Sequence, residues 1–374
     1  MKGARPTCAH VDLRAIRANF ALARERAGGR EVIAVIKADA YGHGALPVAR
    51  ALLQAGCARL AVLSVSEASA LRGARIGAPL LVLGGVHDAE EARAALALPC
   101  TPVIHHAGQL ELLARAAAAS GSPAGVQLEL DTGMCRMGAP PERAVELLEA
   151  VAATPQLRLE GVFTHLARAD ERELAPTRNQ LQAFRALVAD ARARGVRVRE
   201  LHAANSAALV CEALDGAFPE ATAVRPGLML YGANPRGDSA LGLAAAMSLR
   251  TQVVALRRVP AGAAVGYGGE YRARRSTRIA TLAIGYADGA PVSASGRGSA
   301  LVRGRRLPFA GRVSMDYVSL VAGDEAIEIG DEALLFGRSA GGALPVEEAA
   351  AAAGTHAYEL LVRVGARVPR AYDE

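Results

Sequence analysis

The feature that most constrains the fold is an alternation of short apolar runs and alanine-rich helical stretches over residues 31–225. The run EVIAVI at 31–36 is β-branched and indicates a buried strand. Similar runs occur near 60–64, 80–84, 100–104, 126–130, 159–163, 199–203 and 222–225, and helical stretches lie between most of them, as at 107–119, 141–152 and 177–194. Eight such units over roughly 200 residues predict an α/β fold, a (β/α)8 barrel of the TIM type; a doubly wound open sheet is the alternative.

The character of the sequence changes near residue 240. Beyond it, short β-type runs alternate with Gly and Pro about every 8–12 residues, which is typical of a mostly-β domain. We expect that domain to end with a helix at about 345–353 and a strand at 360–367. The expected domains are therefore a barrel over 1–240 and a C-terminal β-domain over 241–374.

Composition excludes several classes of protein. The 374 residues are 51% hydrophobic and 21% charged, which is ordinary for a globular protein. Basic residues are interspersed with acidic ones, and no run of about 18 apolar residues lacks charge, so we expect neither nucleic-acid nor membrane binding. The five Cys are scattered without a CxxC pair and the N-terminus lacks an apolar signal core, which favours a cytoplasmic location and no metal site.

Lysine is almost absent from this chain. Only Lys2 and Lys37 occur among 43 basic residues, and all the others are Arg. Base composition could explain the bias, but Arg replaces Lys poorly where a neutral amine must form, because the guanidinium stays protonated. Lys37 is therefore a candidate nucleophile.

Polar residues follow the predicted strands at the points where each strand ends. They include the segments 37–44, 131–138, 164–165 and 202–206, and Arg225-Pro-Gly. The active site of a barrel lies at this edge, with a phosphate site often formed by the loops after strands seven and eight. A lysine opposite a phosphate site indicates pyridoxal 5'-phosphate held as a Schiff base.

Seven motifs in order resemble those of the alanine racemases. They are AVIKADAYGHG, LDTGMCRMG, the spaced His202–Asn205–Ser206, VRPGLMLYG, GYADG, GRVSMD and THAYE. The resemblance runs essentially from end to end of the chain. It implies a cytoplasmic isomerase that interconverts L-alanine and D-alanine with pyridoxal phosphate, supplies D-alanine for peptidoglycan and works as a head-to-tail homodimer with shared active sites.

The resemblance also implies a role for individual residues. Lys37 matches the lysine that binds the cofactor and serves as one base, and Tyr267 matches the opposite base, contributed by the second subunit. Arg136 and Met315 match the binders of the substrate carboxylate. The remaining cofactor contacts implied are Tyr41, His165, His202, Asn205, Ser206, Arg225, Gly227, Leu228 and Tyr358, and supporting roles fall to Glu129, Asp316 and Tyr286.

The residue types suit racemisation independently of the resemblance. A proton must leave one face of Cα and return on the other, and one base per face is the simplest arrangement. A free lysine amine can serve as one base. Tyrosine, with an ordinary pKa near ~10, needs help from its neighbours to serve as the other.

Glu129 departs from the family pattern. Many relatives have a lysine there, carbamylated to an anion that holds the substrate-binding arginine. A glutamate is an anion without that modification, but it is shorter, so we expect its contact with Arg136 to be water-bridged or repositioned. Strand alternation places residues 127, 129 and 131 on one side, pointing into the barrel.

Three other functions remain open from the sequence. One is a racemase of wider range that also accepts serine or larger residues. Another is a decarboxylase of the same architecture, which the Arg136 carboxylate clamp disfavours. The last is a non-catalytic pyridoxal-phosphate-binding protein, which residues 241–374 disfavour because single-domain relatives of that kind lack a β-domain.

Overall fold

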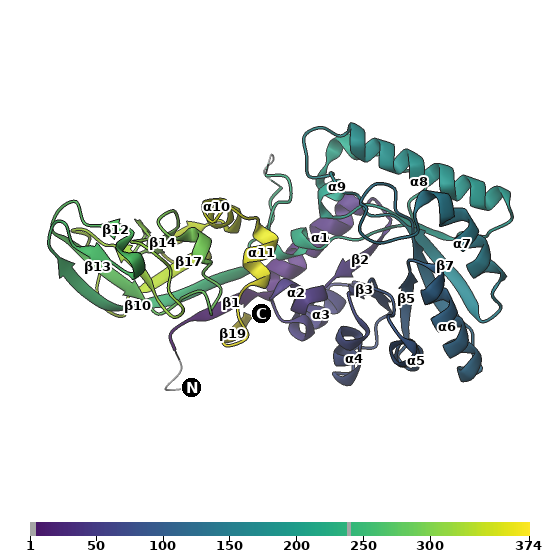
Figure 1. Cartoon of the computed structure of the whole chain (residues 1–374), viewed down its shortest axis with the longest axis horizontal. Helices are drawn as coiled ribbons and strands as arrows, with labels where there is room; N and C mark the ends of the chain where they lie inside the picture. The colour runs from purple at the N-terminus through teal and green to yellow at the C-terminus, as the bar shows by residue number, and fades with distance from the viewer. Residues whose placement is uncertain (1–4, 238–240) are drawn as a thin grey trace.

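Two units lie side by side in Figure 1, a barrel surrounded by helices and an elongated β-domain. This computed structural model describes residues 5–237 and 241–374. The expected boundary near 240 falls at residues 238–240, which lie outside the described residues, as does Lys2. The fold class expected from the sequence is confirmed: a closed parallel barrel is followed by a mostly-β domain.

Eight parallel strands close the barrel in chain order, and the first strand pairs with the last through Glu31 and Ala223. Each strand coincides with an apolar run of the sequence to within a few residues. The strands are β2 (Glu31–Val35), β3 (Arg59–Val62), β4 (Leu80–Val82), β5 (Cys100–Ile104), β6 (Ala124–Glu129), β7 (Leu157–Phe163), β8 (Glu200–His202) and β9 (Ala223–Val224).

The two faces of each barrel strand are buried in different places. Along β2, Ile33 and Val35 join a small apolar cluster inside the barrel, whereas Val32 and Ala34 join the large core beneath the helices. This separation follows from the alternation of side chains along a strand. The interior cluster consists of Ile33, Val35, Ala61, Leu81, Val103, Phe163 and Ala223.

Helices between the strands cover the barrel, and their ends follow local sequence signals. Asp12 caps α1 by accepting hydrogen bonds from Arg14 N and Ala15 N, and Gly28 ends it at φ +59°. The helices are α1 (Leu13–Ala27), α2 (Lys37–Tyr41), α3 (Ala45–Gln54), α4 (Val65–Gly73), α5 (Ala89–Ala97), α6 (Ala107–Ser120), α7 (Pro141–Ala153), α8 (Ala175–Ala193) and α9 (Ser206–Val210). Among the described residues, no helix is both long and apolar enough to cross a membrane.

The β-domain is built around one mixed sheet, with the order β15-β14-β17-β10-β1-β19 and with β13, β16 and β18 paired off this path. A hairpin of β11 and β12 stands apart from the sheet. The strands are β1 (Cys8–Asp12), β10 (Met247–Val259), β11 (Ala264–Val265), β12 (Tyr271–Arg272), β13 (Thr277–Leu282), β14 (Ser299–Val302), β15 (Arg305–Pro308), β16 (Val318–Val321), β17 (Glu332–Ser339), β18 (Gly342–Leu344) and β19 (Arg370–Asp373).

The sequence patterns do not predict the first strand of this sheet, β1. Strand β1 lies within the expected barrel domain 1–240, but it pairs antiparallel with β10 and parallel with β19. Its five residues bury only Ala9 and Val11, a signal too short to stand out locally. Its partners lie more than half the chain away, so only the tertiary structure places it.

The strand expected at 360–367 is wrong. Residues 357–362 form helix α11 (Ala357–Val362), which follows α10 (Val346–Ala352), and the last strand begins at Arg370. The buried residues Ala357, Leu360, Leu361 and Val364 recur at helical spacing. Helix α11 packs closely against the turn after Lys37. The approach is so close that a Cβ at Gly42 would collide with the carbonyl of Leu361.

Candidate active site

Lys37 lies directly beyond β2, at the C-terminal edge of the barrel, and begins an unusual turn. Ala38, Asp39 and Ala40 have φ of 53° and Tyr41 has φ of 54°, so α2 is one left-handed turn. Each non-glycine residue in this region costs about 1–2 kcal/mol. Such strain persists where surrounding contacts impose it, and it is concentrated at functional sites.

Two carboxylates stabilise this left-handed turn. Glu67, on α4, accepts hydrogen bonds from Ala38 N at 2.8 Å and from Leu63 N at 2.7 Å. Asp39 accepts one from Ala45 N at 2.6 Å, at the start of α3. These contacts hold the backbone on both sides of the lysine, so the direction of its side chain is set by neighbouring helices.

The surroundings of Lys37 favour a neutral amine. Burial and the positive charge of Arg136 lower its pKa, whereas the carboxylates of Glu67 and Glu129 raise it; the net direction is downward. A lysine of lowered pKa can act as a nucleophile or a base near neutrality.

Arg225 follows β9 and is buried. Its guanidinium contacts a backbone carbonyl, a histidine ring and a phenylalanine ring. Its Nη2 donates to the Thr164 carbonyl at 2.8 Å, its Nη1 contacts His202 Nδ1, and its Cζ lies 4.4 Å from the centre of the Phe163 ring. Burial lowers its pKa to about 10, although the carboxylates of Glu129 and Glu200 act in the opposite direction. Arg225 is thus a fixed cation near neutrality.

His165 lies close enough to Arg225, Arg136 and Lys37 to be affected by their charges. Its pKa falls to about 3 because of burial and then the positive charges of Arg225, Arg136 and Lys37. The imidazole is therefore neutral at ordinary pH. These four side chains come from the ends of different strands, and the barrel brings them to one edge.

A cluster of hydroxyl and backbone groups, here called the cradle, lies where β8 and β9 end. Ser206 is buried, and its Oγ accepts hydrogen bonds from Gly227 N at 2.8 Å and Met229 N at 3.3 Å. Asn205 caps α9 through Ala208 N at 3.0 Å. A Cβ at residue 227 would collide with Tyr41 Oη, so glycine is required for this close approach. Leu228 follows directly and begins the 3-10 helix η2 (Leu228–Tyr231).

Tyr41 and Tyr358 flank this cradle. Their rings lie 6.1 Å apart, and Tyr41 also stacks on Tyr231 at 4.7 Å. Burial raises the pKa of Tyr41 and raises that of Tyr358 to about 12, so both hydroxyls remain protonated hydrogen-bond donors near neutrality.

Glu129 is buried at the end of β6 and points into the barrel, as strand alternation predicted. Its Oε2 lies 3.2 Å from Nδ1 of His105, which is itself buried after β5 and whose Nε2 contacts the Leu83 carbonyl at 2.9 Å. Within the described part of the chain, no hydrogen bond or ion pair joins Glu129 to Arg136. The shorter side chain reaches a neighbouring strand instead of the exposed loop that carries Arg136.

The remaining predicted residues lie on the β-domain. Tyr267 is 69% exposed in η3 (Tyr267–Gly269), between β11 and β12, and Figure 1 shows this hairpin region at the end remote from the barrel. Tyr286 and Met315 are also exposed. Asp316 binds Arg5 at 3.2 Å and Arg367 at 2.7 Å. The structure of one chain therefore does not bring Tyr267 to Lys37.

Sequence reasoning missed Glu67 and His105. His105 follows β5 directly, so the rule that located the other polar residues at strand ends could have found it. Glu67 lies inside a helix, and its contact with the lysine turn had no local signal.

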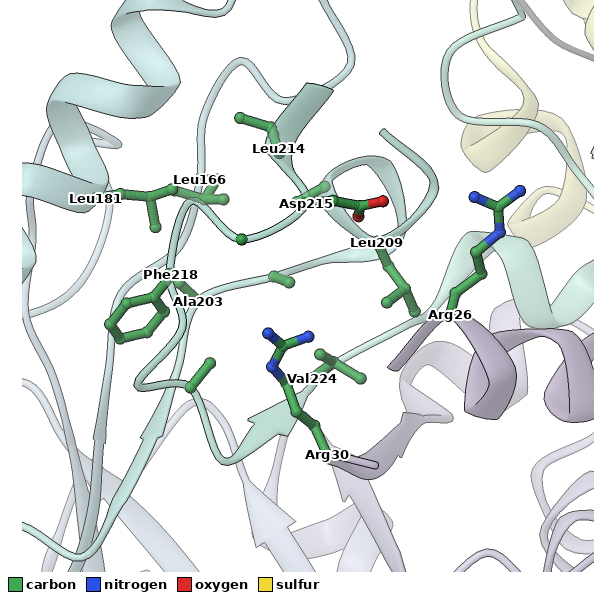
Figure 2. Close-up of a pocket in the computed structure, with 14 residues that line it drawn as sticks. Arg26, Arg30, Leu166, Leu181, Ala203, Leu209, Leu214, Asp215, Phe218 and Val224 are labelled. Atoms are coloured by element: carbon green, nitrogen blue, oxygen red, sulfur yellow. The ribbon is translucent and has the colours of Figure 1, made fainter. Parts of the chain in front are cut away.

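A separate hollow, lined in part by Ala208 and Leu209 of α9, is shown in Figure 2. None of the predicted site residues lines it. Its two arginines serve local structure, since Arg26 pairs with Glu212 at 3.4 Å and Arg30 donates to the Ala27 carbonyl at 3.2 Å. The described residues hold no group of three or more His, Cys, Asp or Glu side chains that could bind a metal ion.

The residues at the barrel edge suit pyridoxal phosphate. A lysine of lowered pKa can bond to its aldehyde, the Ser206–Gly227 cradle and the two tyrosine hydroxyls can receive its phosphate, and Arg225 can face its ring. A barrel with these groups, followed by a β-domain, defines a class of pyridoxal-phosphate enzymes.

Comparison with known proteins gives the family. The alanine racemase N-terminal domain matches residues 11–235, and the alanine racemase C-terminal domain matches residues 246–372. The alanine racemase of Thioalkalivibrio sulfidiphilus is 44% identical, with 97% of this chain and 98% of that protein covered. This chain belongs to the alanine racemase family.

Solved structures agree with this assignment. The alanine racemase from D-cycloserine-producing Streptomyces lavendulae superposes with a TM-score of 0.93 at 37% identity, covering 100% of this chain and 98% of that one. The alanine racemase of Bartonella henselae, solved with covalently bound pyridoxal phosphate, gives a TM-score of 0.88 at 29% identity over 98% of this chain and 99% of that one.

Proposed function

We propose that this chain interconverts L-alanine and D-alanine, with Lys37 serving one face of the substrate Cα and Tyr267 of the partner subunit the other. The observation that carries the proposal is the convergence of Lys37, Arg136, His165 and Arg225 at one edge of the barrel. Burial there, and after it the neighbouring positive charges, lower the pKa of the lysine and of His165. Pyridoxal phosphate, when bound, withdraws electrons from Cα and makes its proton removable.

Protonation states at the barrel edge support these roles. Lys37 must be neutral to accept a proton, and its lowered pKa increases the neutral fraction. Arg225 stays cationic and donates hydrogen bonds only, so it would hold the ring of bound pyridoxal phosphate without exchanging protons near neutrality. His165 is half-buried and neutral, so it adds no charge beside Lys37, Arg136 and Arg225.

Substrate binding is assigned to the groups that can face a carboxylate. Arg136 carries a guanidinium in the exposed loop after β6, and a guanidinium matches a carboxylate with two parallel hydrogen bonds. Met315 would contribute a backbone group from the β-domain. A pocket completed by two chains would set the size of the accepted side chain. Alanine is proposed as the main substrate because both units of the chain match alanine racemase domains.

A head-to-tail homodimer would complete the site. Tyr267 is mostly exposed and lies between β11 and β12, outside the barrel that carries Lys37, so a second chain is needed to present it. The D-alanine produced would supply peptidoglycan in the cytoplasm. The free state of all five Cys supports a reducing compartment.

Racemase assays on a panel of L-amino acids test the proposal, together with borohydride reduction and peptide mapping of the pyridoxal-phosphate-loaded protein. Alanine should be the best substrate, and the fixed label should lie on the peptide that contains Lys37. Lys37→Arg should carry no label and lose at least about 10²–10⁴-fold in activity, because a guanidinium neither bonds to the aldehyde nor accepts a proton. A label elsewhere would refute the assignment.

A further inference from the structure

A chain of hydrogen bonds runs through the barrel interior from Arg225 to the opposite edge. It passes through His202 and Gln127 to Glu200, then to Arg59 and Glu31. Arg225, His202 and Gln127 are buried, and Glu200 is largely so. Apart from Arg225 and His202, these residues have no role in the proposed function.

The two ends of the connection from Arg225 to Glu200 have fixed hydrogen-bonding character. Glu200 is a carboxylate that only accepts, and Arg225 is a guanidinium that only donates. Although burial opposes it, hydrogen bonds from His202 and Arg59 hold the pKa of Glu200 at about 2, so the carboxylate stays ionised. Gln127 and His202, which lie between these two groups, must therefore present a donor to Glu200 and an acceptor to Arg225.

The carboxylate sets the orientation of the Gln127 amide. Glu200 Oε1 lies 2.6 Å from Gln127 Nε2, and a rotated amide would bring two acceptor oxygens to that distance. Gln127 Oε1 must then face His202, whose Nε2 lies 2.9 Å away and 3.2 Å from Glu200 Oε1. Since both neighbours accept, Nε2 carries the hydrogen.

The tautomer of His202 determines whether its Nδ1 presents a lone pair or a hydrogen to Arg225 Nη1. Burial and the charge of Arg225 lower the pKa of His202 to about 3, so the ring is neutral and has a single N–H. With that hydrogen on Nε2, Nδ1 presents a lone pair to Arg225 Nη1. The other tautomer would set two hydrogens against each other and displace the guanidinium.

The packing around the Gln127 side chain leaves room for its hydrogen bond to Glu200. Residue 161, on β7 between β6 and β8, is a glycine. A Cβ there would lie 3.0 Å from Gln127 Nε2 and 3.1 Å from Glu200 Cβ, tighter than side chains normally tolerate. The missing side chain leaves the space in which Gln127 and Glu200 meet.

We propose that Glu200 and Gln127 are positioning residues that assign the tautomer of His202 and thereby hold the guanidinium of Arg225 in one orientation against the cofactor ring. The proposal rests on the role given to Arg225 in the proposed function. Its structural half, the single tautomer, can be measured whether or not the enzyme racemises alanine.

The first experiment uses the unaltered holoenzyme labelled with ¹⁵N-histidine. Ring-nitrogen NMR should show His202 with a protonated Nε2 and an unprotonated Nδ1, and the signals are identified by their loss in His202→Asn. The opposite tautomer, or a mixture of the two, would overturn the proposal without any question of whether a variant folds.

The second experiment compares Glu200→Gln with the matched control Glu31→Gln. Both carboxylates bind Arg59, at 2.7 Å and 2.6 Å, but only Glu200 contacts Gln127. A glutamine at 200 can donate, so the Gln127 amide can rotate and both His202 tautomers should appear. The visible spectrum of the bound cofactor should shift, and kcat should fall about three- to tenfold at similar KM, the fold-change equivalent to one ordinary hydrogen bond.

The control should keep the single tautomer, the spectrum and kcat. Glu200→Gln behaving like Glu31→Gln in all three would refute the positioning role. Gly161→Ala provides a second variant if Glu200→Gln does not fold, since its methyl group displaces Gln127 without removing a charge; an unchanged tautomer and spectrum there would equally count against the proposal. Failure of the borohydride label at Lys37 would refute the proposed function alone.

Discussion

Lys37 lies among charges of both signs, and its reactivity depends on their balance. Burial and then Arg136 lower its pKa, whereas Glu67 and Glu129 raise it. The chain has only one other lysine, Lys2, so the chemistry of a single amine can be followed directly.

Arg136→Leu and Glu129→Gln should shift the pKa of Lys37 in opposite directions. Loss of the guanidinium raises it and loss of the carboxylate lowers it. Because only the neutral amine reacts, the onset of acylation of Lys37 in cofactor-free protein should move to higher pH for Arg136→Leu and to lower pH for Glu129→Gln. Peptide mapping separates Lys37 from Lys2. Arg143→Leu, at an exposed position of α7, is the control, and shifts of equal sign would contradict this account.

Glu129 supplies a carboxylate at the position where the family resemblance implies a modified lysine. Its carboxylate needs no carbon dioxide to form, and it is already held beside His105. Racemisation should therefore proceed at the same rate in buffer stripped of bicarbonate and carbon dioxide as in buffer supplemented with them. A rate that falls on stripping and recovers on addition would show that some other group depends on carbamylation.

At the scale of the element, the left-handed turn after β2 is the most strained segment at the site. Ala38 is exposed at φ +53°, ψ +51°, a conformation that β-branched residues adopt with great difficulty. The turn survives because Glu67 and Asp39 hold its backbone. It directs Lys37 and Tyr41 to the same site from positions only four residues apart.

Ala38→Val should lower the melting temperature, and Ala38→Gly should leave it unchanged or raise it. A glycine avoids the penalty of about 1–2 kcal/mol for a left-handed residue, offset in part by its greater freedom in the unfolded chain. Thermal unfolding of the pyridoxal-phosphate-loaded protein measures both. Ala94→Val, at an exposed position of regular helix α5, provides the control and should cost only a few tenths of a kcal/mol. Equal losses at the two sites would show that the turn is not strained.

At the scale of the whole molecule, the two proposed bases lie on different units of the chain. Lys37 begins α2 at the barrel edge, and Tyr267 lies in η3 between β11 and β12. Figure 1 shows β12 on the part of the β-domain remote from α2. In the proposed dimer, each chain therefore contributes Lys37 to one active site and Tyr267 to the other.

Mixing Lys37→Ala and Tyr267→Phe chains should restore activity. Each variant alone should be inactive in racemisation, whereas a mixed dimer contains one site with both bases intact. Random exchange should restore about a quarter of the wild-type activity, because half of the dimers are mixed and each has one of two sites. Native mass spectrometry confirms chain exchange. No recovery despite exchange would show that Tyr267 serves its own chain or is not a base.

Much of the barrel could be predicted because its signals are local. An apolar run of about five residues indicates a strand wherever it occurs, and polar residues just beyond it mark the active edge. The same rule located Lys37, His165 and Arg225. It failed for α11, where buried residues at helical spacing were mistaken for a strand.

Contacts between distant segments could not be predicted in this way. Gln127 and His202 are 75 residues apart, and only closure of the barrel makes one the hydrogen-bond partner of the other. Likewise, nothing within five residues of Cys8 reveals that β1 joins a sheet formed by the end of the chain.

The sequence by itself determined the order of strands and helices, the residue types at each strand end and the single interior lysine. These follow from side-chain period and chemistry within a few residues. The tertiary structure alone decided that Glu129 lies against His105, that Glu200 reaches His202 through Gln127, and that Tyr267 is remote from Lys37. Hydrogen bonds and charges act over a few ångströms in space, and the fold, rather than sequence separation, determines which groups come within that distance.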